Sequence, residues 1–204
     1  KLATWCNDNF LHLNVSKTKE MLVDFRTKNF VFDGLISIGG EDVEMVDSFK
    51  YLGVTLDSKL TFSQHVEAVH KTCQQRMHVV RKLRSFYVDP KLILIQYVSL
   101  IQSLLSYCST CFYPSLSAEN RNVLLSVANT AAKIIGLPTT SLTELTQRAL
   151  SRKARAVVSD PAHPLHPNFQ LLPSERRYRT IKWKTNRYRY TFVPQAILSL
   201  NNSL

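Results

Sequence analysis

The stretch LTFSQHVEAVHKTCQQRMHVVRKLRSFYVDP (residues 60–90) decides the fold of the middle of this chain. Its apolar residues recur at steps of three and four, which places them on one face of an α-helix. They are Phe62, Val66, Val69, Cys73, Met77, Val80 and Leu83. Thr61, followed three residues later by Gln64, predicts a capping box at the start of this helix.

Two further helices are predicted to follow, joined by short connections. Asp89-Pro90 supplies an N-cap and a proline at the first helical position, so a helix should run from 91 to about 107. Because this segment is apolar nearly all round, we expect it to form the buried centre of a helical bundle. Ser117 should cap a third helix, which ends at Gly136 and has its apolar stripe at Leu124, Val127, Ala131 and Ile134.

The segments before this bundle predict a mixture of helix and strand. Residues 1–12 are typical of the end of an amphipathic helix, and strands are expected at 21–25, 35–38 and 49–56. Gly39-Gly40 marks a turn. Strands this short need neighbours, so the expected arrangement is one small antiparallel sheet.

The last third of the chain has a different character. A basic helix is predicted at 142–158, followed by an extended linker at 160–173, which holds four of the eight prolines. A basic and aromatic segment at 176–190 leads to a short closing helix at 194–200. The sequence as a whole therefore predicts an α+β protein.

The net charge of the chain limits the kinds of partner that it is expected to bind. The formal net charge is +11, and residues 148–189 hold eleven Lys and Arg against only Asp160 and Glu175. Such a field favours phosphate backbones, anionic membrane surfaces or acidic proteins. The apolar fraction of 45% argues against disorder throughout.

Other bulk features predict an intracellular location, nuclear or cytoplasmic. Four scattered cysteines do not make a disulfide-stapled secreted fold, and no signal peptide is visible. Gln and Ser residues interrupt the apolar run 92–111, which favours a core helix over a membrane span. The sequence opens at Lys1, without Met and inside the expected helix, so we interpret it as a piece of something longer.

Three patterns follow one another along the chain. They are WCNDNFLHLNVSKTK (residues 5–19), FKYLGV (49–54) with Asp57 and His65 after it, and SLIQSLLSYCSTCFYP (99–114). In this order and spacing they resemble the downstream part of the reverse transcriptase of LINE-type, non-LTR retrotransposons. The resemblance covers about residues 1–136.

This resemblance implies three parts. Residues 1–58 would be a truncated palm remnant with a partial antiparallel sheet, and residues 59–138 a helical, thumb-like bundle. Residues 139–204 would hold a basic helix, the Pro-rich linker and a basic, partly extended tail that looks like the family's C-terminal part. Such a fragment would bind primer and template without catalysing polymerisation.

The same resemblance implies roles for particular residues. Tyr51, Leu52 and Gly53 would support the primer end, where glycine lets the backbone approach a ligand closely. Lys17 would be an accessory residue near the active site, where an ammonium can stabilise a departing pyrophosphate. The alternative for Tyr51 and Gly53 is a core tyrosine beside a strand glycine, and the alternative for Lys17 is an ordinary exposed lysine. Contacts to duplex backbone are expected from Lys71, Arg76, Arg81, Lys82 and Arg84.

In this interpretation the chain holds no complete catalytic site. Polymerase chemistry needs carboxylates that hold two Mg²⁺ ions, and in the family these precede the segment that matches Trp5. Asp24, Asp33 and Asp57 lie in the wrong motifs to replace them. We therefore expect no cofactor in this chain, with Mg²⁺ bound only if the upstream palm is present. The expected partners are RNA or DNA and the upstream part of the same polyprotein, and we expect no membrane partner.

The basic tail is the strongest candidate for binding nucleic acid. Cations neutralise phosphates, while aromatic faces and Arg planes accept unpaired bases. The residues concerned are Arg176, Arg177, Tyr178, Arg179, Lys182, Trp183, Lys184, Arg187, Tyr188, Arg189 and Tyr190. The alternative is a solvated edge strand kept basic for solubility.

Several other interpretations stay open. Cys108-x-x-Cys111 suggests zinc, but no second pair of ligands follows, so we expect core packing and no metal. Residues 48–89 also resemble the module named as the AlkB homologue eight N-terminal domain, found in tRNA-modifying dioxygenases and methyltransferases. The chain shows neither the iron triad nor the methyl-donor loop of those enzymes. A helical protein-interaction module and an inert retroelement remnant are the remaining alternatives.

Overall fold

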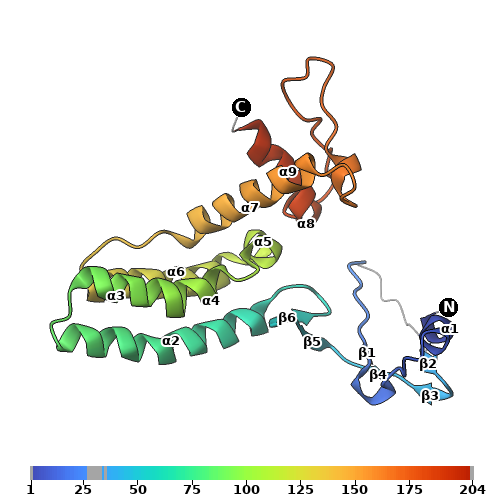
Figure 1. The fold of residues 1–204 in the computed structure, drawn as a ribbon, viewed down its shortest axis with the longest axis horizontal. Helices are drawn as coiled ribbons and strands as arrows, with labels where there is room; N and C mark the ends of the chain where they lie inside the picture. The colour runs from blue at the N-terminus through green and yellow to red at the C-terminus, as the bar shows by residue number, and fades with distance from the viewer. Residues whose placement is uncertain (1, 27–33, 35, 203–204) are drawn as a thin grey trace. The chain divides into compact units, whose positions relative to one another are not determined.

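The computed structural model describes residues 2–26, 34 and 36–202 (Figure 1). The chain divides into two compact units, Lys1–His65 and Val66–Leu204, each with its own internal packing. Helices predominate, and short paired strands occur in the first unit. This composition confirms the predicted α+β class.

The first unit is built from short elements. They are α1 (Leu2–Asp8), the 3-10 turn η1 (Val15–Lys17), β1 (Lys19–Glu20), β2 (Ser37–Ile38), β3 (Glu41–Asp42), β4 (Glu44–Met45), β5 (Ser48–Tyr51) and β6 (Val54–Asp57). Among the described residues the strands form three separate pairs: β1 with β4 in parallel, and β2–β3 and β5–β6 antiparallel. The predicted strand at 21–25 does not form, and the one at 35–38 is shortened to β2, with Leu35 outside the described residues.

The segment predicted as one strand at 49–56 is instead a β-hairpin. Tyr51 pairs with Val54, and the two residues between them have positive φ, 46° at Leu52 and 85° at Gly53. Positive φ at both central positions is what a type I′ hairpin turn requires. The prediction of a continuous strand was wrong because the aromatic and β-branched residues on either side favour one strand and two strands equally.

The loop between β6 and the first long helix is organised by Asp57. Its carboxylate accepts hydrogen bonds from the backbone N–H groups of Thr61 (3.0 Å) and Phe62 (2.7 Å). Desolvation raises the pKa of Asp57, but these bonds outweigh it and hold the pKa below its ordinary value. The helix begins at Ser63, two residues beyond the predicted N-cap Thr61, whose hydroxyl accepts a long bond (3.4 Å) from the Ser63 N–H.

The first unit buries few of its large side chains. Val43, Val54 and Phe62 are buried, whereas other apolar residues are exposed, among them Trp5, Phe10, Leu22, Phe25, Ile36 and Met45. Exposed apolar surface of this kind promotes association. We therefore predict that residues 1–58 are poorly soluble in isolation.

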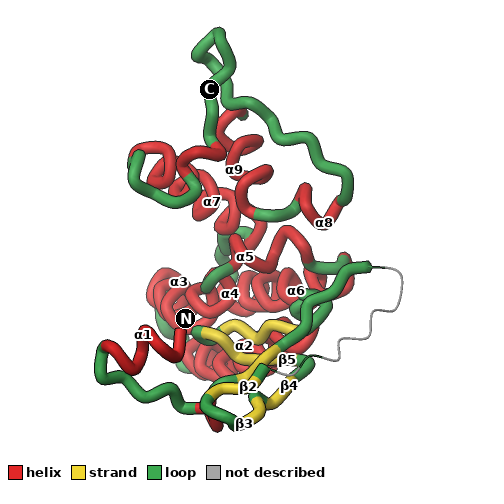
Figure 2. The backbone as a smooth tube through the Cα atoms, turned by 90° about the vertical axis from the view of Figure 1, so that its right-hand side faces the viewer, coloured by secondary structure: helices red, strands yellow, loops and turns green. Residues whose placement is uncertain are grey.

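The second unit consists of helices and loops (Figure 2). It contains most of α2 (Ser63–Ser85), then α3 (Pro90–Tyr97), the π-helical turn η2 (Val98–Gln102), α4 (Ser103–Ser106), α5 (Ser109–Phe112), the 3-10 turn η3 (Tyr113–Ser115), α6 (Ala118–Ile135), α7 (Leu142–Ser159), the 3-10 turn η4 (His166–Asn168), α8 (Asn186–Arg189) and α9 (Phe192–Asn201). Figure 1 shows α2, α3, α4 and α6 running side by side as a bundle.

The helix predicted at 91–107 is the succession α3, η2 and α4. Asp89 caps it as predicted, because its carboxylate accepts the Lys91 N–H at 2.7 Å. One face is fully buried at Ile93, Tyr97, Ile101 and Leu105, but the opposite face exposes Leu92, Ile95 and Val98. The expectation of burial nearly all round was therefore wrong. By length and composition alone Pro90–Ser115 is also apolar enough to cross a membrane, a test that core helices pass as well.

Helix α6 follows the sequence closely. The Ser117 hydroxyl accepts the Asn120 N–H, and Gly136 closes the helix with φ at 80°, as the two predicted caps require. Leu124, Val127 and Ala131 are buried, but the stripe continues to Ile135 rather than to the predicted Ile134, which is half-buried.

Helices α7 and α9 form a second apolar cluster, in which Phe169 takes part. Its α7 and α9 members are Leu150, Ala154, Val157, Ala196, Ile197 and Leu200. The predicted extended linker at 160–173 was wrong, because this segment forms turns and η4 and buries Phe169. Three successive turns are closed by hydrogen bonds from the His163, His166 and Phe169 N–H groups to the carbonyls three residues earlier, and each turn has a proline at its second position. These turns bring Phe169 back onto the helix pair.

Candidate nucleic-acid interface

The basic tail is a long loop pinned at its base to α9 (Figure 1). Leu171 and Tyr178 form an antiparallel bridge, and the Asn201 side chain accepts the Tyr178 N–H (2.8 Å) and donates to its carbonyl (3.0 Å). The Phe169 ring packs edge-on against the Tyr178 ring, with centroids 6.3 Å apart. Tyr178, predicted as a binding residue, therefore anchors the loop, and the residues around it are held in place.

The cations of the tail are exposed. Arg176, Arg177, Arg179, Lys182 and Lys184 all lie on the surface. Within the described part of the chain, the recorded ion pairs are Lys19–Glu44, Arg26–Asp24 and Arg148–Glu144, so none involves these five side chains. Their charge therefore faces solvent in the described structure.

The aromatic residues of the tail differ in availability. Trp183 is half-buried and has the Arg189 guanidinium over its ring at 5.4 Å, while the same group lies 5.8 Å from the Tyr190 ring. Tyr188 and Tyr190 are exposed. Thr185 caps α8 by accepting the Tyr188 N–H, so a short helix fixes these two tyrosines. The segment offers flat rings beside cations, as stacking of unpaired bases requires.

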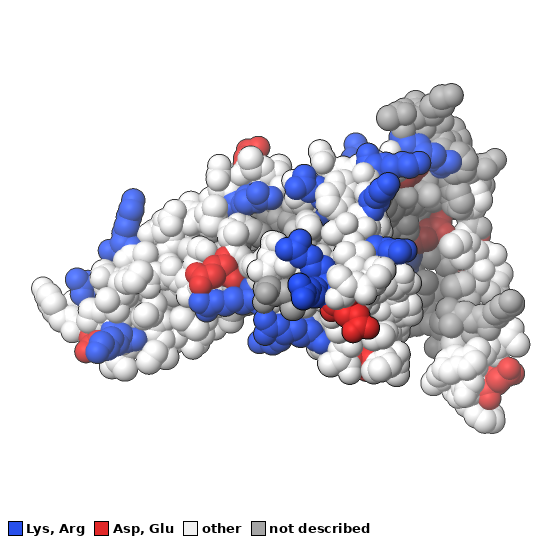
Figure 3. All heavy atoms as spheres, turned by 90° about the horizontal axis from the view of Figure 1, so that it is seen from above, with Lys and Arg blue, Asp and Glu red and all other residues white. Residues whose placement is uncertain are grey.

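Helix α7 adds cations that the residue-by-residue prediction omitted. Arg148, Arg152 and Arg155 follow one another at steps of four and three, which puts them on one side of the helix. With Gln147 and Ser151 they line a shallow groove of about 390 Å³. The spacing was visible in the sequence, where this segment was predicted as a basic helix without a binding role. In Figure 3 blue side chains gather over the part of the chain that holds α7 to α9.

The cations of α2 do not behave alike. Lys71, Arg81, Lys82 and Arg84 are exposed. Arg76 is half-buried, and its guanidinium donates to the Leu100 carbonyl at 2.6 Å, which ties α2 to η2. Arg76 therefore has a structural role. The Lys82 ammonium, by contrast, lies over the ring of the neighbouring Phe86 at 5.4 Å.

The residues implied as a primer support lie in the first unit. Tyr51 and Leu52 are exposed at the tip of the β5–β6 hairpin, where Gly53 completes the turn. Lys17 ends η1, with its N–H bonded to the Asn14 side chain at 3.1 Å and its own side chain exposed. The buried imidazole of His65 lies under the hairpin, 3.5 Å from the Thr55 nitrogen, and burial followed by the charge of Lys50 lowers its pKa.

The four cysteines are free thiols, and the pair in the Cys-x-x-Cys motif is not packed in the core. Cys108 is half-buried and Cys111 is exposed, which corrects the expectation of core packing. Cys108 breaks the helix at φ of 50°, so α5 turns away and leaves Cys111 at the surface. Within the residues described, no group of three or more His, Cys, Asp or Glu side chains lies together as a metal site would need.

The second unit is thus a helical, strongly cationic domain with aromatic rings beside its exposed charges. Among curated proteins, the chain is similar to a probable RNA-directed DNA polymerase from transposon BS of Drosophila melanogaster, with 37% identity over 82 residues. The match covers 40% of this chain and 9% of that protein. No protein-family model and no solved structure matches the chain. The partial match supports a reverse-transcriptase-like, retroelement-related relationship.

Proposed function

We propose that this chain binds RNA or DNA through the cationic surface of its second unit, as a non-catalytic fragment of a reverse transcriptase lineage. The observation that carries the proposal is the exposure of the cations in the tail. Arg176, Arg177 and Arg179 are exposed on a loop whose base is fixed, and no recorded ion pair of the described residues uses them.

The fixed base of this loop favours binding over mere solubility. A solvated edge needs charge but no anchor, whereas Tyr178 is held by Asn201 and Phe169. Because these contacts already order the backbone of the loop, less backbone entropy is lost when its exposed cations meet a phosphate backbone. Exposed Tyr188 and Tyr190 add stacking surfaces at the other end of the segment.

Fluorescence anisotropy with single-stranded RNA and with an RNA–DNA hybrid, across a salt series, tests this proposal. For a single strand the slope of log K against log salt is about −0.7 for each neutralised phosphate. The triple variant Arg176→Gln, Arg177→Gln, Arg179→Gln should therefore make the slope shallower by about 2 and weaken binding.

The matched control removes the same charge elsewhere, with Lys59→Gln, Lys91→Gln and Lys133→Gln at exposed positions outside the tail. It should change the slope much less than the tail variant does. Absence of salt-sensitive binding by the unmodified chain, or equal loss in the two triple variants, would refute the proposal.

The finer assignments belong to the same proposal. In it, the exposed cations of α2 follow a duplex backbone, and Tyr51, Leu52 and Gly53 support a primer end. Lys17 acts only as an accessory, and Mg²⁺ binds only where an upstream palm completes the site. The 9% coverage of the transposon protein is why that protein's polymerase activity is not part of what we propose for this chain.

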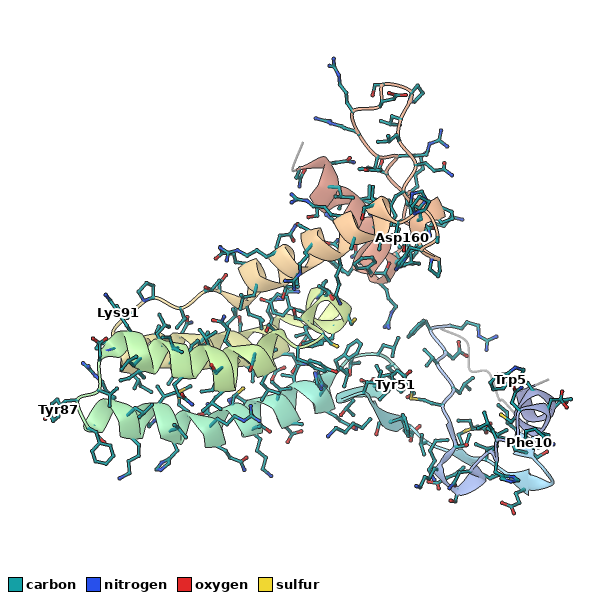
Figure 4. The ribbon with its side chains drawn as sticks, in the orientation of Figure 1. Trp5, Phe10, Tyr51, Tyr87, Lys91 and Asp160 are labelled. Atoms are coloured by element: carbon teal, nitrogen blue, oxygen red, sulfur yellow. The ribbon has the colours of Figure 1, made fainter. Side chains whose placement is uncertain are left out.

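A helical protein-interaction module is the second candidate, favoured by one observation. Leu92, Ile95 and Val98 are exposed on one face of α3 and η2. Tyr87, in the turn between α2 and α3, is 94% exposed and points away from the bundle (Figure 4). An interaction through this face predicts binding to a protein partner with little salt dependence. Such binding should survive truncation after Pro138 and be lost in Ile95→Glu.

The AlkB homologue eight alternative has less support. It rests on the likeness of residues 48–89 alone. Among the described residues no group of three or more His, Cys, Asp or Glu side chains lies together, so an iron-dependent reaction would need ligands from elsewhere. A dioxygenase or methyltransferase assay of the purified chain tests it directly.

A further inference from the structure

A cavity of about 460 Å³ opens where α7 ends, between α5, α7, α9 and the turns that follow α7. Its apolar walls come from Ala156, Val157, Leu165 and Phe192. Asp160 stands at its rim, at the end of α7 (Figure 4). This volume lies within the range of small-molecule sites, about 300–1,000 Å³.

The rim of the cavity carries a small set of polar groups. The Lys153 ammonium donates to the Thr110 hydroxyl at 3.2 Å, which holds the cation at the edge. His163 accepts the Leu165 N–H at Nδ1 (3.1 Å), so in the neutral ring Nε2 carries the proton and is a donor. The Asp160 carboxylate receives the Ala162 N–H at one oxygen (3.0 Å) and is a further acceptor. Donors and an acceptor around an apolar hollow match the edge of a nucleobase.

The surroundings of the cavity favour a base that belongs to a strand. Phe192 lies two residues after Tyr190, and Lys153 lies on α7 between Arg152 and Arg155. Phosphates attracted to these cations would bring successive bases past the opening. A flat, apolar ring with a polar edge suits the walls and the rim together.

From this geometry we infer that the cavity binds one unpaired nucleobase of a strand whose phosphates lie on the α7 and tail cations. The inference rests on the proposed function and adds a base-binding site to it. The base packs against Phe192 and the apolar walls, while its edge meets His163 and Asp160. Lys153 neutralises an adjacent phosphate.

Filling the cavity tests the inference. Ala156 is an exposed helix residue on the cavity wall, so Ala156→Phe occupies the space without removing a hydrogen bond. Ala118→Phe makes the same change at an exposed position of α6 and is the matched control. Thermal melting of both variants checks that they fold. Affinity is measured for a twelve-nucleotide deoxythymidine strand and for an abasic strand of equal length.

Stacking of a base on protein is worth about 1–3 kcal/mol, roughly 5- to 150-fold in affinity. Ala156→Phe should therefore weaken the thymidine strand by at least about fivefold and leave the abasic strand unchanged. Ala118→Phe should change neither. Equal affinities of Ala156→Phe and the unmodified chain for the thymidine strand would overturn the cavity proposal while leaving the tail proposal intact.

The exposed thiol of Cys111 on the cavity wall provides a second measurement. A bound thymidine strand should slow alkylation of Cys111 by iodoacetamide, and Cys108 serves as the internal reference. Unchanged Cys111 alkylation in the strand-bound protein would overturn the inference. Protection by free thymidine monophosphate at concentrations where the strand gives none would also overturn it, in favour of a free nucleotide. Absence of binding to either strand would instead refute the proposed function.

Discussion

Two isoleucines on the same helix should respond in opposite ways to the same substitution. Ile93 has 0% of its surface exposed and Ile95 has 61% exposed, although they are two residues apart in α3. Ile93→Ala removes buried methyl groups and leaves a cavity, which typically costs about 2–5 kcal/mol. Ile95→Ala removes surface that is already in water, and the better helix propensity of alanine offsets the loss, so its effect should stay within about 0.5 kcal/mol.

Urea denaturation followed by far-UV circular dichroism measures both effects. Because the propensity change is the same for the two variants, the difference between their unfolding free energies, about 2 kcal/mol or more, reports burial alone. The dependence of free energy on urea should be equal in both, so that the midpoints can be compared. Equal destabilisation by the two substitutions would refute the one-sided burial of this helix and restore the central position that the sequence predicts.

Three further changes have defined outcomes. In Gly136→Ala the added methyl group enters open space, but the residue must keep φ at 80°. Backbone strain alone should therefore destabilise the second unit by about 1 kcal/mol, measured by urea denaturation. An unchanged midpoint would contradict the helix end described above. Asp57→Ala should lower the hydrogen-exchange protection of the Phe62 amide on the order of tenfold. In the unmodified chain the protection that Asp57 gives is present above about pH 4 and is lost as pH falls through the lowered pKa of Asp57. Protection that does not change with pH would contradict this role of Asp57. Burial raises the pKa of Cys73 from 9.0 to about 11, so the folded state holds the thiol neutral where the unfolded chain ionises it. The free energy of unfolding should therefore fall as pH rises from 9 toward 11, and by less in Cys73→Ala; identical alkaline profiles would exclude this cause.

The local signals of the sequence placed the helices well. The Asp89, Ser117 and Gly136 caps lie where they were predicted, and α7 and α9 occupy nearly the predicted ranges. Caps are formed by a side chain and a backbone group a few residues away, so they depend little on the rest of the fold. The hairpin at 48–57 was missed because strand propensity does not reveal where a chain reverses.

The candidate site was predicted in composition but not in geometry. The sequence alone showed that residues 176–190 combine cations with aromatic rings. It did not separate Tyr178, which anchors the loop, from Tyr188 and Tyr190, which are exposed. Arg76 was likewise grouped with its neighbours, although its guanidinium reaches the Leu100 carbonyl.

The sequence by itself determined most of the helical segments, the caps at Asp89, Ser117 and Gly136, and the concentration of positive charge, because each depends on neighbours within a few residues. The tertiary structure alone decided which face of an apolar helix is buried and that Phe169 folds back onto α7 and α9. It also decided that the cavity forms beside Asp160. These features arise from contacts between segments far apart in the chain, and no local pattern encodes which of several apolar surfaces meets another.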